Sequence, residues 1–191
     1  PDFMVWNQVT ELPFFWKPFY SFTAAVLAGL LAPACFALIF GFLAFRSRIK
    51  GVYFAIITQA LALMAWLVFN RNETNLGGTN GLTDFKTILG FRLSAPGTQL
   101  ALYVITVLCL GGAYALCRWL IASRAGRVLI AIRDSEQRVL FSGYSPANYK
   151  LFVFVVSAAL AGLARILYVP QVGIITPAQM GVLPSLEMVV W

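Results

Sequence analysis

The sequence predicts an all-α fold, a polytopic bundle of transmembrane helices. Of the 191 residues, 60% are hydrophobic and only 11% are charged, against about 25% charged residues in soluble globular domains. Long runs without a charged residue recur along the chain, and the first, 19–45, exceeds the ~20 residues that span a bilayer core. Lysine and arginine gather between alternate runs, as the cytoplasmic loops of membrane proteins require.

The same composition excludes several classes of protein. So few charged residues cannot supply the polar surface of a soluble domain, and so many apolar residues rule out intrinsic disorder. The chain has no histidine, which removes the commonest metal ligand and general base. A membrane enzyme is therefore the weakest function class, and we expect this chain to bind no metal or cofactor of its own.

Four apolar runs define the predicted membrane spans. Pro33 lies near the middle of the first run and predicts a kinked or tilted helix there. In the same run Ala24, Ala28 and Ala32 recur every four residues, which would let a second helix approach closely. We treat the chain, 1–191, as one transmembrane domain and expect it to be an internal piece of a longer protein. The predicted spans are 19–45, 51–69, 100–117 and 151–169.

The distribution of lysine and arginine predicts which loops face the cytoplasm. Between the first and second spans lie Arg46, Arg48 and Lys50 without an acidic residue. Between the third and fourth spans, the segment 118–150 holds six basic residues and two acidic ones. Both segments can be cytoplasmic because two spans separate them, as the positive-inside rule demands. This accounts for the net charge of +7 without nucleic acid as a partner.

The chain becomes irregular towards its C-terminal end. Pro170, Pro177 and Pro184 follow one another at intervals of seven residues, with Gly173 and Gly181 between them. A straight helix would lose a backbone hydrogen bond at each proline. One interpretation is a broken or re-entrant segment that lines a pathway, since irregular backbone is tolerated at membrane depth only beside protein or water. The other is an outer loop followed by a further span.

The predicted cytoplasmic coupling loop, 118–150, contains an amphipathic stretch at 126–140. If this stretch forms one helix, its apolar residues share one face, and Asp134 and Arg138 pair one turn apart on the other. Glu136 falls within the apolar face, an unusual place for a carboxylate unless a partner meets it there. Such a helix either rests on lipid head groups or docks into a groove of a cytosolic protein.

Several motifs follow one another in a fixed order along the chain. They are Lys50–Thr58, the glycine-rich Gly77–Leu82, Gly126-Arg127, Ala131–Asp134, Glu136, Gly143, Lys150 and Ser157–Ala164. In order and spacing, over residues 46–190, they closely resemble the permease subunits of branched-chain amino acid ABC importers. Further features are more similar to the urea-importing branch, in particular its permease of the "C" type: Gln59, Asn72–Thr74, Thr83–Phe85, Phe141–Tyr144 and Tyr168–Gly173.

The resemblance implies a function and a set of partners. The chain would be a permease subunit of the bacterial inner membrane that forms the translocation pathway for urea and has no enzymatic activity. ATP and Mg²⁺ would bind to separate cytosolic ATPase subunits, in keeping with the lack of a G-x-x-x-x-G-K-[ST] motif in this sequence. A paralogous permease subunit and a periplasmic solute-binding protein would complete the importer, with membrane lipid around it.

The resemblance also implies that the stretch 126–140 is a coupling helix that contacts the ATPase subunit. The candidate docking residues are Gly126, Arg127, Ile132, Arg133, Asp134 and Glu136.

The candidate residues of the solute pathway are polar groups in or near the spans. Thr58 and Gln59 lie near the middle of the second span and suit a small neutral solute, or bond to a neighbouring helix. Asn80 belongs to the glycine-rich segment, which is either a plain outer loop or a loop that lines the entrance. Glu187, beside an apolar run, is a pathway or inter-subunit candidate. Arg165, where the family has a small residue, either snorkels towards the outer interface or pairs with Glu187 in gating.

Two other functions stay open. The same family includes importers of branched-chain amino acids, and fold-level similarity does not separate these solutes from urea. A passive channel or an ion-coupled carrier for a small polar solute would work without ATP. A carrier would need titratable groups within its spans, and the predicted spans contain almost none.

Overall fold

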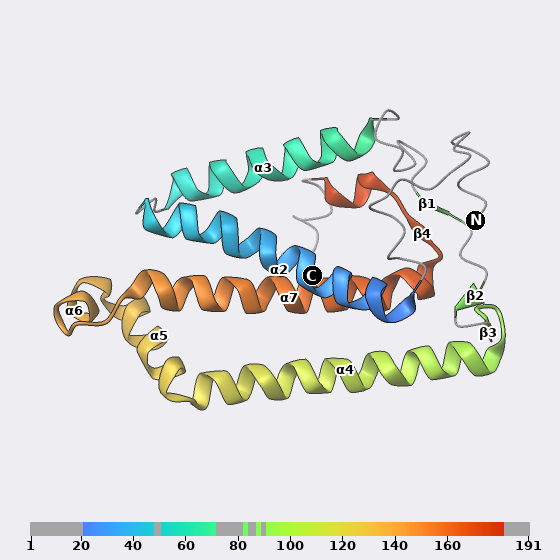
Figure 1. Ribbon diagram of the computed structural model, residues 1–191. Helices are drawn as coiled ribbons and strands as arrows, with labels where there is room; N and C mark the ends of the chain where they lie inside the picture. Colours follow the sequence, from blue (N-terminus) through green and yellow to red (C-terminus); the bar gives the residue numbers. More distant parts are fainter. Residues whose placement is uncertain (1–20, 48–50, 72–81, 84–86, 89–90, 182–191) are drawn as a thin grey trace.

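A computed structural model of the chain describes residues 21–47, 51–71, 82–83, 87–88 and 91–181 (Figure 1). The described residues form four long helices, each long and apolar enough to cross a membrane. These helices are α2 (Phe22–Arg46), α3 (Val52–Asn70), α4 (Pro96–Ala122) and α7 (Pro146–Val172). The prediction of an all-α membrane bundle is confirmed. Each predicted span overlaps one long helix, and α4 and α7 extend beyond the predicted spans at both ends.

Short elements connect the long helices. Two short helices, α5 (Arg124–Asp134) and α6 (Glu136–Phe141), lie between α4 and α7. Two-residue strands pair antiparallel, β1 with β4 and β2 with β3. The strands are β1 (Leu82–Thr83), β2 (Thr87–Ile88), β3 (Phe91–Arg92) and β4 (Ile174–Ile175).

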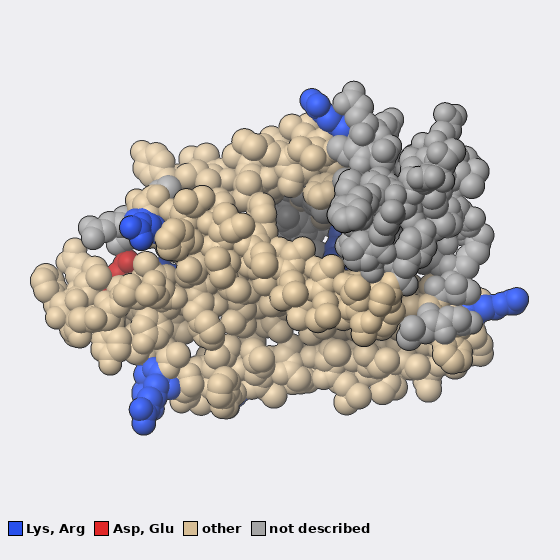
Figure 2. All heavy atoms as spheres, in the orientation of Figure 1, with Lys and Arg blue, Asp and Glu red and all other residues tan. Residues whose placement is uncertain are grey.

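The long helices alternate in direction, with α2 between α3 and α7 and with α4 on the other side of α7 (Figure 1). At one end, Arg46 of α2 lines a common hollow with Glu136 and Lys150. We call this end, where α2 ends and α7 begins, the basic end. Figure 2 shows charged side chains at the two ends of this face, whereas between the ends a basic side chain is visible inside a hollow. This distribution suits a membrane-embedded middle.

The most extensive contact in the bundle is between α2 and α7. A Cβ at Gly162 of α7 would lie 2.7 Å from the carbonyl oxygen of Gly29 and 2.8 Å from Cγ of Pro33, both on α2. A Cβ at Gly41 of α2 would lie 2.8 Å from Cδ1 of Leu151 on α7. Ala37, which lies between Pro33 and Gly41 on the same face of α2, is buried. Small residues at every fourth position of α2 therefore let the two backbones approach each other.

From the sequence we expected Ala24, Ala28 and Ala32 to form a close helix contact. The observed contact has the same four-residue spacing but uses different positions of α2. Ala32 is exposed, and the contact runs one residue later, from Gly29 to Gly41. Because nearly every side chain of α2 is apolar, no polar face marks which side of the helix turns inwards. Glycine permits a closer approach than alanine, and the glycine positions select the packed face.

Four phenylalanine rings join three helices near the basic end. The ring of Phe54 on α3 lies 6.2 Å from that of Phe40 and 5.7 Å from that of Phe45, both on α2. The ring of Phe154 on α7 lies 6.3 Å and 5.8 Å from the same two rings. Aromatic pairs at these separations attract each other beyond the area that they bury. The cluster fastens the first turn of α3 to α2.

Helix α7 continues past Pro170, where we expected a straight helix to fail, and also past Arg165. It ends at Gly173, whose φ of +73° is a left-handed conformation that favours glycine. Pro170 is tolerated because it stands in the last turn, where one lost backbone hydrogen bond leaves the rest of the helix intact. The broken segment therefore begins at Gly173.

After Gly173 the chain turns back towards the bundle (Figure 1). Ile175 of β4 pairs with Leu82 of β1, and the 3-10 helix η4 (Pro177–Met180) then packs against α3. Residues 174–181 therefore fold back onto the bundle, which is compatible both with a re-entrant segment and with an outer loop that covers the end of α3. The third proline of the series, Pro184, lies outside the described residues.

The stretch 126–140, which we expected to form one amphipathic helix, forms two. Helix α5 ends at Asp134, and Ser135 is extended, with φ −160° and ψ 97°, before α6 begins. The apolar residues therefore do not share one continuous face, although Ile132 of α5 and Val139 of α6 are both buried. Asp134 lies 3.3 Å from Nε of Arg133 instead of pairing with Arg138. Aspartate and serine favour helix ends, because their side chains compete for backbone hydrogen bonds.

The unusual position of Glu136 is explained by α7. Nζ of Lys150 donates a hydrogen bond of 2.8 Å to Oε1 of Glu136, and the two side chains are 32% and 26% exposed. A half-buried carboxylate is stabilised by a charged donor of this kind. The ion pair fastens α6 to the second turn of α7.

We expect the substitution Gly162→Ala to destabilise the bundle. The added Cβ would meet the backbone of α2, and overpacking of this kind costs about 1–3 kcal/mol. Gly111 of α4 is the control, because nothing lies within 4 Å of a Cβ built there. Thermal unfolding of the detergent-solubilised protein should show a lower midpoint for Gly162→Ala and not for Gly111→Ala. Equal midpoints would contradict the close contact of α2 with α7.

Glu136 and Lys150 should show a larger coupling energy than an exposed ion pair. In a double-mutant cycle with Glu136→Gln and Lys150→Met, we expect about 1 kcal/mol or more, because the bond is charge-assisted and half-buried. Arg133 and Asp134 are the control pair, since their side chains are 77% and 65% exposed and such pairs contribute about 0.2–1 kcal/mol. Unfolding free energies measure both cycles. A coupling no larger than that of the control would show that the pair does not hold α6.

Candidate functional site

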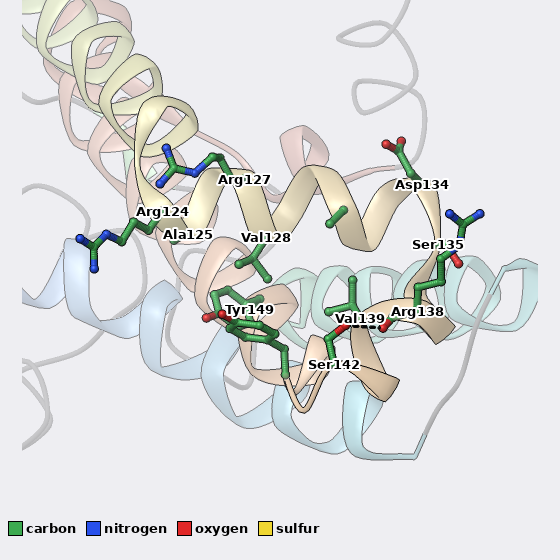
Figure 3. Close-up of a pocket in the computed structure, with 12 residues that line it drawn as sticks. Arg124, Ala125, Arg127, Val128, Asp134, Ser135, Arg138, Val139, Ser142 and Tyr149 are labelled. Atoms are coloured by element: carbon green, nitrogen blue, oxygen red, sulfur yellow. Dashed lines mark hydrogen bonds between the residues drawn. The ribbon is translucent and has the colours of Figure 1, made fainter.

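The basic end carries an open groove of about 730 Å³ between α5, α6 and the beginning of α7. In Figure 3, Val128 of α5 points towards Tyr149 of α7, and Val139 rises from α6 towards α5. The rings of Tyr144 and Tyr149 meet edge to face, with their centroids 6.3 Å apart. The interior of the groove is therefore apolar and aromatic.

The rim of the groove is positively charged. It carries three arginines, from α5 and α6, against one acidic side chain, and all four are exposed: Arg124, Arg127, Arg138 and Asp134. A rim of this sign attracts acidic groups and steers their approach. The groove thus suits a partner segment that combines apolar and acidic side chains.

A tight corner between α4 and α5 sets the direction of the groove. The hydroxyl of Ser123 donates to the carbonyl oxygen of Leu120 at 2.6 Å and accepts from the backbone N–H of Gly126 at 3.2 Å. Ser123 thereby caps α5 in the usual way for a serine N-cap. A Cβ at Gly126 would collide with the carbonyl oxygens of Leu120 and Ile121. Glycine is therefore required at this corner.

Three of the predicted docking residues are exposed, and they lie on two surfaces. Arg127 and Asp134 line the groove. Arg133 lines a neighbouring apolar hollow of about 430 Å³ between α4, α5 and α7. Sequence reasoning did not select Arg124 or Tyr149, because they reach the groove only through the fold of α5 against α7.

The other three predicted docking residues shape the site and present little surface to a partner. Gly126 is buried at the corner, and Ile132 is buried with 7% of its surface exposed. Glu136 faces Lys150. A pattern of residue types cannot distinguish these structural positions from exposed ones when the helix is broken at Ser135.

The structure describes two of the four predicted pathway residues, and both lie on α3. Thr58 is half-buried on α3, and its hydroxyl lies 2.9 Å and 3.1 Å from the carbonyl oxygens of Ala55 and Phe54 in the same helix. Gln59 is exposed on α3. Asn80 and Glu187 lie outside the described residues.

Further polar groups occur at the opposite end from the groove. Nε2 of Gln171 on α7 donates a hydrogen bond of 2.6 Å to Oγ1 of Thr106 on α4, which joins these two helices. Oε1 of Gln179, on η4, is buried and has no hydrogen-bond partner. Arg165 is half-buried, and its Cζ lies 5.3 Å from the centre of the Tyr168 ring. The charge of Arg165 stands out in the sequence, whereas the burial of Oε1 of Gln179 depends on how residues 174–181 fold back onto the bundle.

Comparison with known proteins agrees with this architecture. The family model described as "Branched-chain amino acid transport system / permease component" matches residues 3–191. The high-affinity branched-chain amino acid transport system permease protein LivM of Escherichia coli (strain K12) is 26% identical over 177 residues, 81% of this chain and 41% of its own length. LivM of Salmonella typhimurium (strain LT2) gives the same identity and coverage. The chain spans about two fifths of the length of these curated relatives.

No solved structure matches the chain. The family model nevertheless covers almost every residue, and the four long apolar helices fit a multi-pass membrane protein. These findings support the resemblance to branched-chain amino acid permeases, and they do not single out the urea branch. The chain belongs to the family of permease components of branched-chain amino acid transport systems.

Proposed function

We propose that this chain forms part of the translocation pathway of an ATP-driven importer in the bacterial inner membrane, and that its basic groove receives a cytosolic ATPase subunit. The observation that carries this proposal is the groove itself, with its apolar interior and positive rim at the end where α5 and α6 lie. The lysine and arginine distribution assigns that end to the cytoplasm. ATP and Mg²⁺ would bind to the ATPase subunit.

The connections of the groove suit a coupling role. Helix α5 is fixed to α4 by the corner at Ser123 and Gly126. Helix α6 is fixed to α7 by the ion pair of Glu136 and Lys150. A partner seated between α5 and α6 would therefore move α4 and α7 relative to each other, each as a rigid element.

The other proposed partners follow from the family and from the exposed surfaces. Helix α4 exposes large apolar side chains along its length, for example Tyr103, Leu110 and Trp119. Such a surface in a membrane faces lipid or another helix, and a paralogous permease subunit would cover part of it. A periplasmic solute-binding protein would deliver the solute at the end opposite the groove.

Two observations bear on the solute, and they favour different molecules: the sequence motifs favour urea, and the curated relatives favour a branched-chain amino acid. Motifs such as Phe141–Tyr144 and Tyr168–Gly173 are similar to those of urea importers, and Thr58 and Gln59 offer the uncharged donors and acceptors that urea needs. The curated relatives are permeases of branched-chain amino acid transport systems. Both solutes are small and carry N–H donors, so the two proposals share one importer and differ in its specificity.

Reversing the charge of Arg127 should weaken the docking of the ATPase subunit. We expect Arg127→Glu to reduce co-purification of the ATPase and ATP-driven uptake about tenfold, since a favourable charge at the rim becomes repulsive. Arg92→Glu is the control, because Arg92 is exposed on β3, outside the groove. Pull-down from detergent-solubilised membranes measures the association. Equal losses for both variants, or no loss for Arg127→Glu, would reject the groove as the docking site.

The importer should take up its solute only when ATP is present. Cells with and without the intact permease are supplied with labelled urea or labelled leucine, before and after ATP depletion. Permease-dependent and ATP-dependent uptake of urea alone would support the urea branch, and uptake of leucine alone would support amino acid import. Uptake that survives ATP depletion would reject the importer and favour a passive channel or an ion-coupled carrier.

A further inference from the structure

A second hollow lies on the face of α5 that points away from the groove. Leu129, Ile130 and Arg133 line it from α5, and α4 and α7 complete its walls. The residues of α5 that line the groove form a different set, and on a helix of 3.6 residues per turn the two sets occupy opposite faces. Helix α5 therefore stands between the groove and this hollow of about 430 Å³, which we call the α4–α7 hollow.

The walls of the α4–α7 hollow are almost entirely apolar, and Arg133 is the one charged side chain among the residues that line it. Leu160 on its wall also lines a further hollow of about 230 Å³ between α4 and α7, which extends to Thr106. Along α4 the two hollows run from Ile121 to Thr106, about 22 Å at the rise of an α-helix. This apolar seam is longer than half of the ~30 Å hydrocarbon core of a bilayer, so it can hold an acyl chain of one leaflet.

Arg133 places a positive charge at the mouth of the α4–α7 hollow. Its side chain is 77% exposed, and its Nε lies 3.3 Å from Oδ1 of Asp134. A guanidinium has five N–H donors in a fork that matches a phosphate, so donors are left for a phosphate beside the contact with Asp134. The hollow lies at the basic end, which the lysine and arginine distribution assigns to the cytoplasm. Anionic head groups are found in the cytoplasmic leaflet.

We propose that the α4–α7 hollow binds an anionic phospholipid of the cytoplasmic leaflet, with one acyl chain between α4 and α7 and the phosphate on Arg133. Basic pockets between transmembrane helices on this side of a membrane bind such head groups. The apolar walls and the single cation match the two parts of a phospholipid. At the far end of the seam, the hydrogen bond of 2.6 Å from Gln171 to Thr106 holds α7 against α4. A seam closed in this way admits an acyl chain and not a helix, whose diameter is about 10 Å.

The bound lipid would support α5 from the side opposite the groove. Gly126 fixes the beginning of α5 at the corner with α4, whereas Ile130, farther along α5, is 43% exposed and lines the hollow. An acyl chain would cover Ile130 and fill the space behind α5. The proposal also gives Arg133, one of the predicted docking residues, a lipid in place of a protein as its partner.

The test uses the complete protein with its associated subunits, purified in detergent. Phosphatidylglycerol with a photoreactive group on one acyl chain is added, and labelled peptides of α4 and α7 are identified by mass spectrometry. We expect label on the residues that line the α4–α7 hollow. Unlabelled phosphatidylglycerol should compete about fivefold better than phosphatidylcholine with the same acyl chains, because one arginine near an anionic head group contributes about 1 kcal/mol.

Two pairs of variants separate the charge from the space. Arg133→Met should abolish the preference for phosphatidylglycerol, and Arg133→Lys should keep most of it, since an ammonium also binds phosphate. Arg92→Met, at an exposed arginine of β3, is the control. Ser157→Trp, at an exposed residue that lines the hollow, should fill the space and prevent labelling. Gly111→Trp is its control, because nothing lies within 4 Å of a Cβ built there.

Several results would overturn the inference. Equal competition by the two lipids, or an unchanged preference in Arg133→Met, would show that Arg133 does not select the lipid. Loss of the preference in Arg133→Lys as well would leave arginine with a structural role. If the lining is not labelled and a cross-linker on Cys117 of the hollow reaches another subunit, a protein helix covers this site. The arginine variants decide the matter if Ser157→Trp fails to assemble, and none of these measurements depends on ATP or on the solute.

Discussion

The close approach of α2 and α7 is the contact on which the rest of the structure depends. In lipid, apolar side chains gain nothing from leaving water, so helices associate through tight van der Waals contacts. Gly29 and Gly41 on α2 and Gly162 on α7 remove the side chains that would keep the two backbones apart. Once α7 is held in this way, Lys150 is placed against Glu136 at one end, and the turn at Gly173 is placed at the other.

The two ends of α7 differ in how their polar groups are satisfied. At the basic end, Glu136 and Lys150 neutralise each other, and Ser123 caps α5. Towards the other end, Arg165 has an aromatic ring in place of an anion, and Gln179 on η4 has a buried oxygen without a donor. The ion pair holds two helices together, whereas the cost of the Arg165 charge within a membrane-spanning helix is offset only in part, by the ring of Tyr168.

The groove and the segment 174–181 are connected through the same helix, α7. In the proposed importer, a partner bound between α5 and α6 acts on α7 through the ion pair with Lys150. The same helix carries Arg165 and leads into the turn at Gly173. Because packed helices move as rigid bodies, a shift at the groove would reach the opposite end of α7 without any change within the helix.

The sequence by itself determined the fold class and the four spans, because apolar runs of about 20 residues are long enough to cross a membrane as helices, which satisfy their own backbone hydrogen bonds. It also carried the motifs of the family, and it identified Arg165 as unusual, because a charged residue next to a long apolar run is rare in a membrane span. Tertiary structure decided the register of the contact between α2 and α7, the break at Ser135 and the partner of Glu136. It also placed Gly126 at a corner and buried Oε1 of Gln179 where η4 packs against the bundle. These features depend on contacts between residues far apart in the chain, and a uniformly apolar helix carries no local signal for the neighbour it will meet.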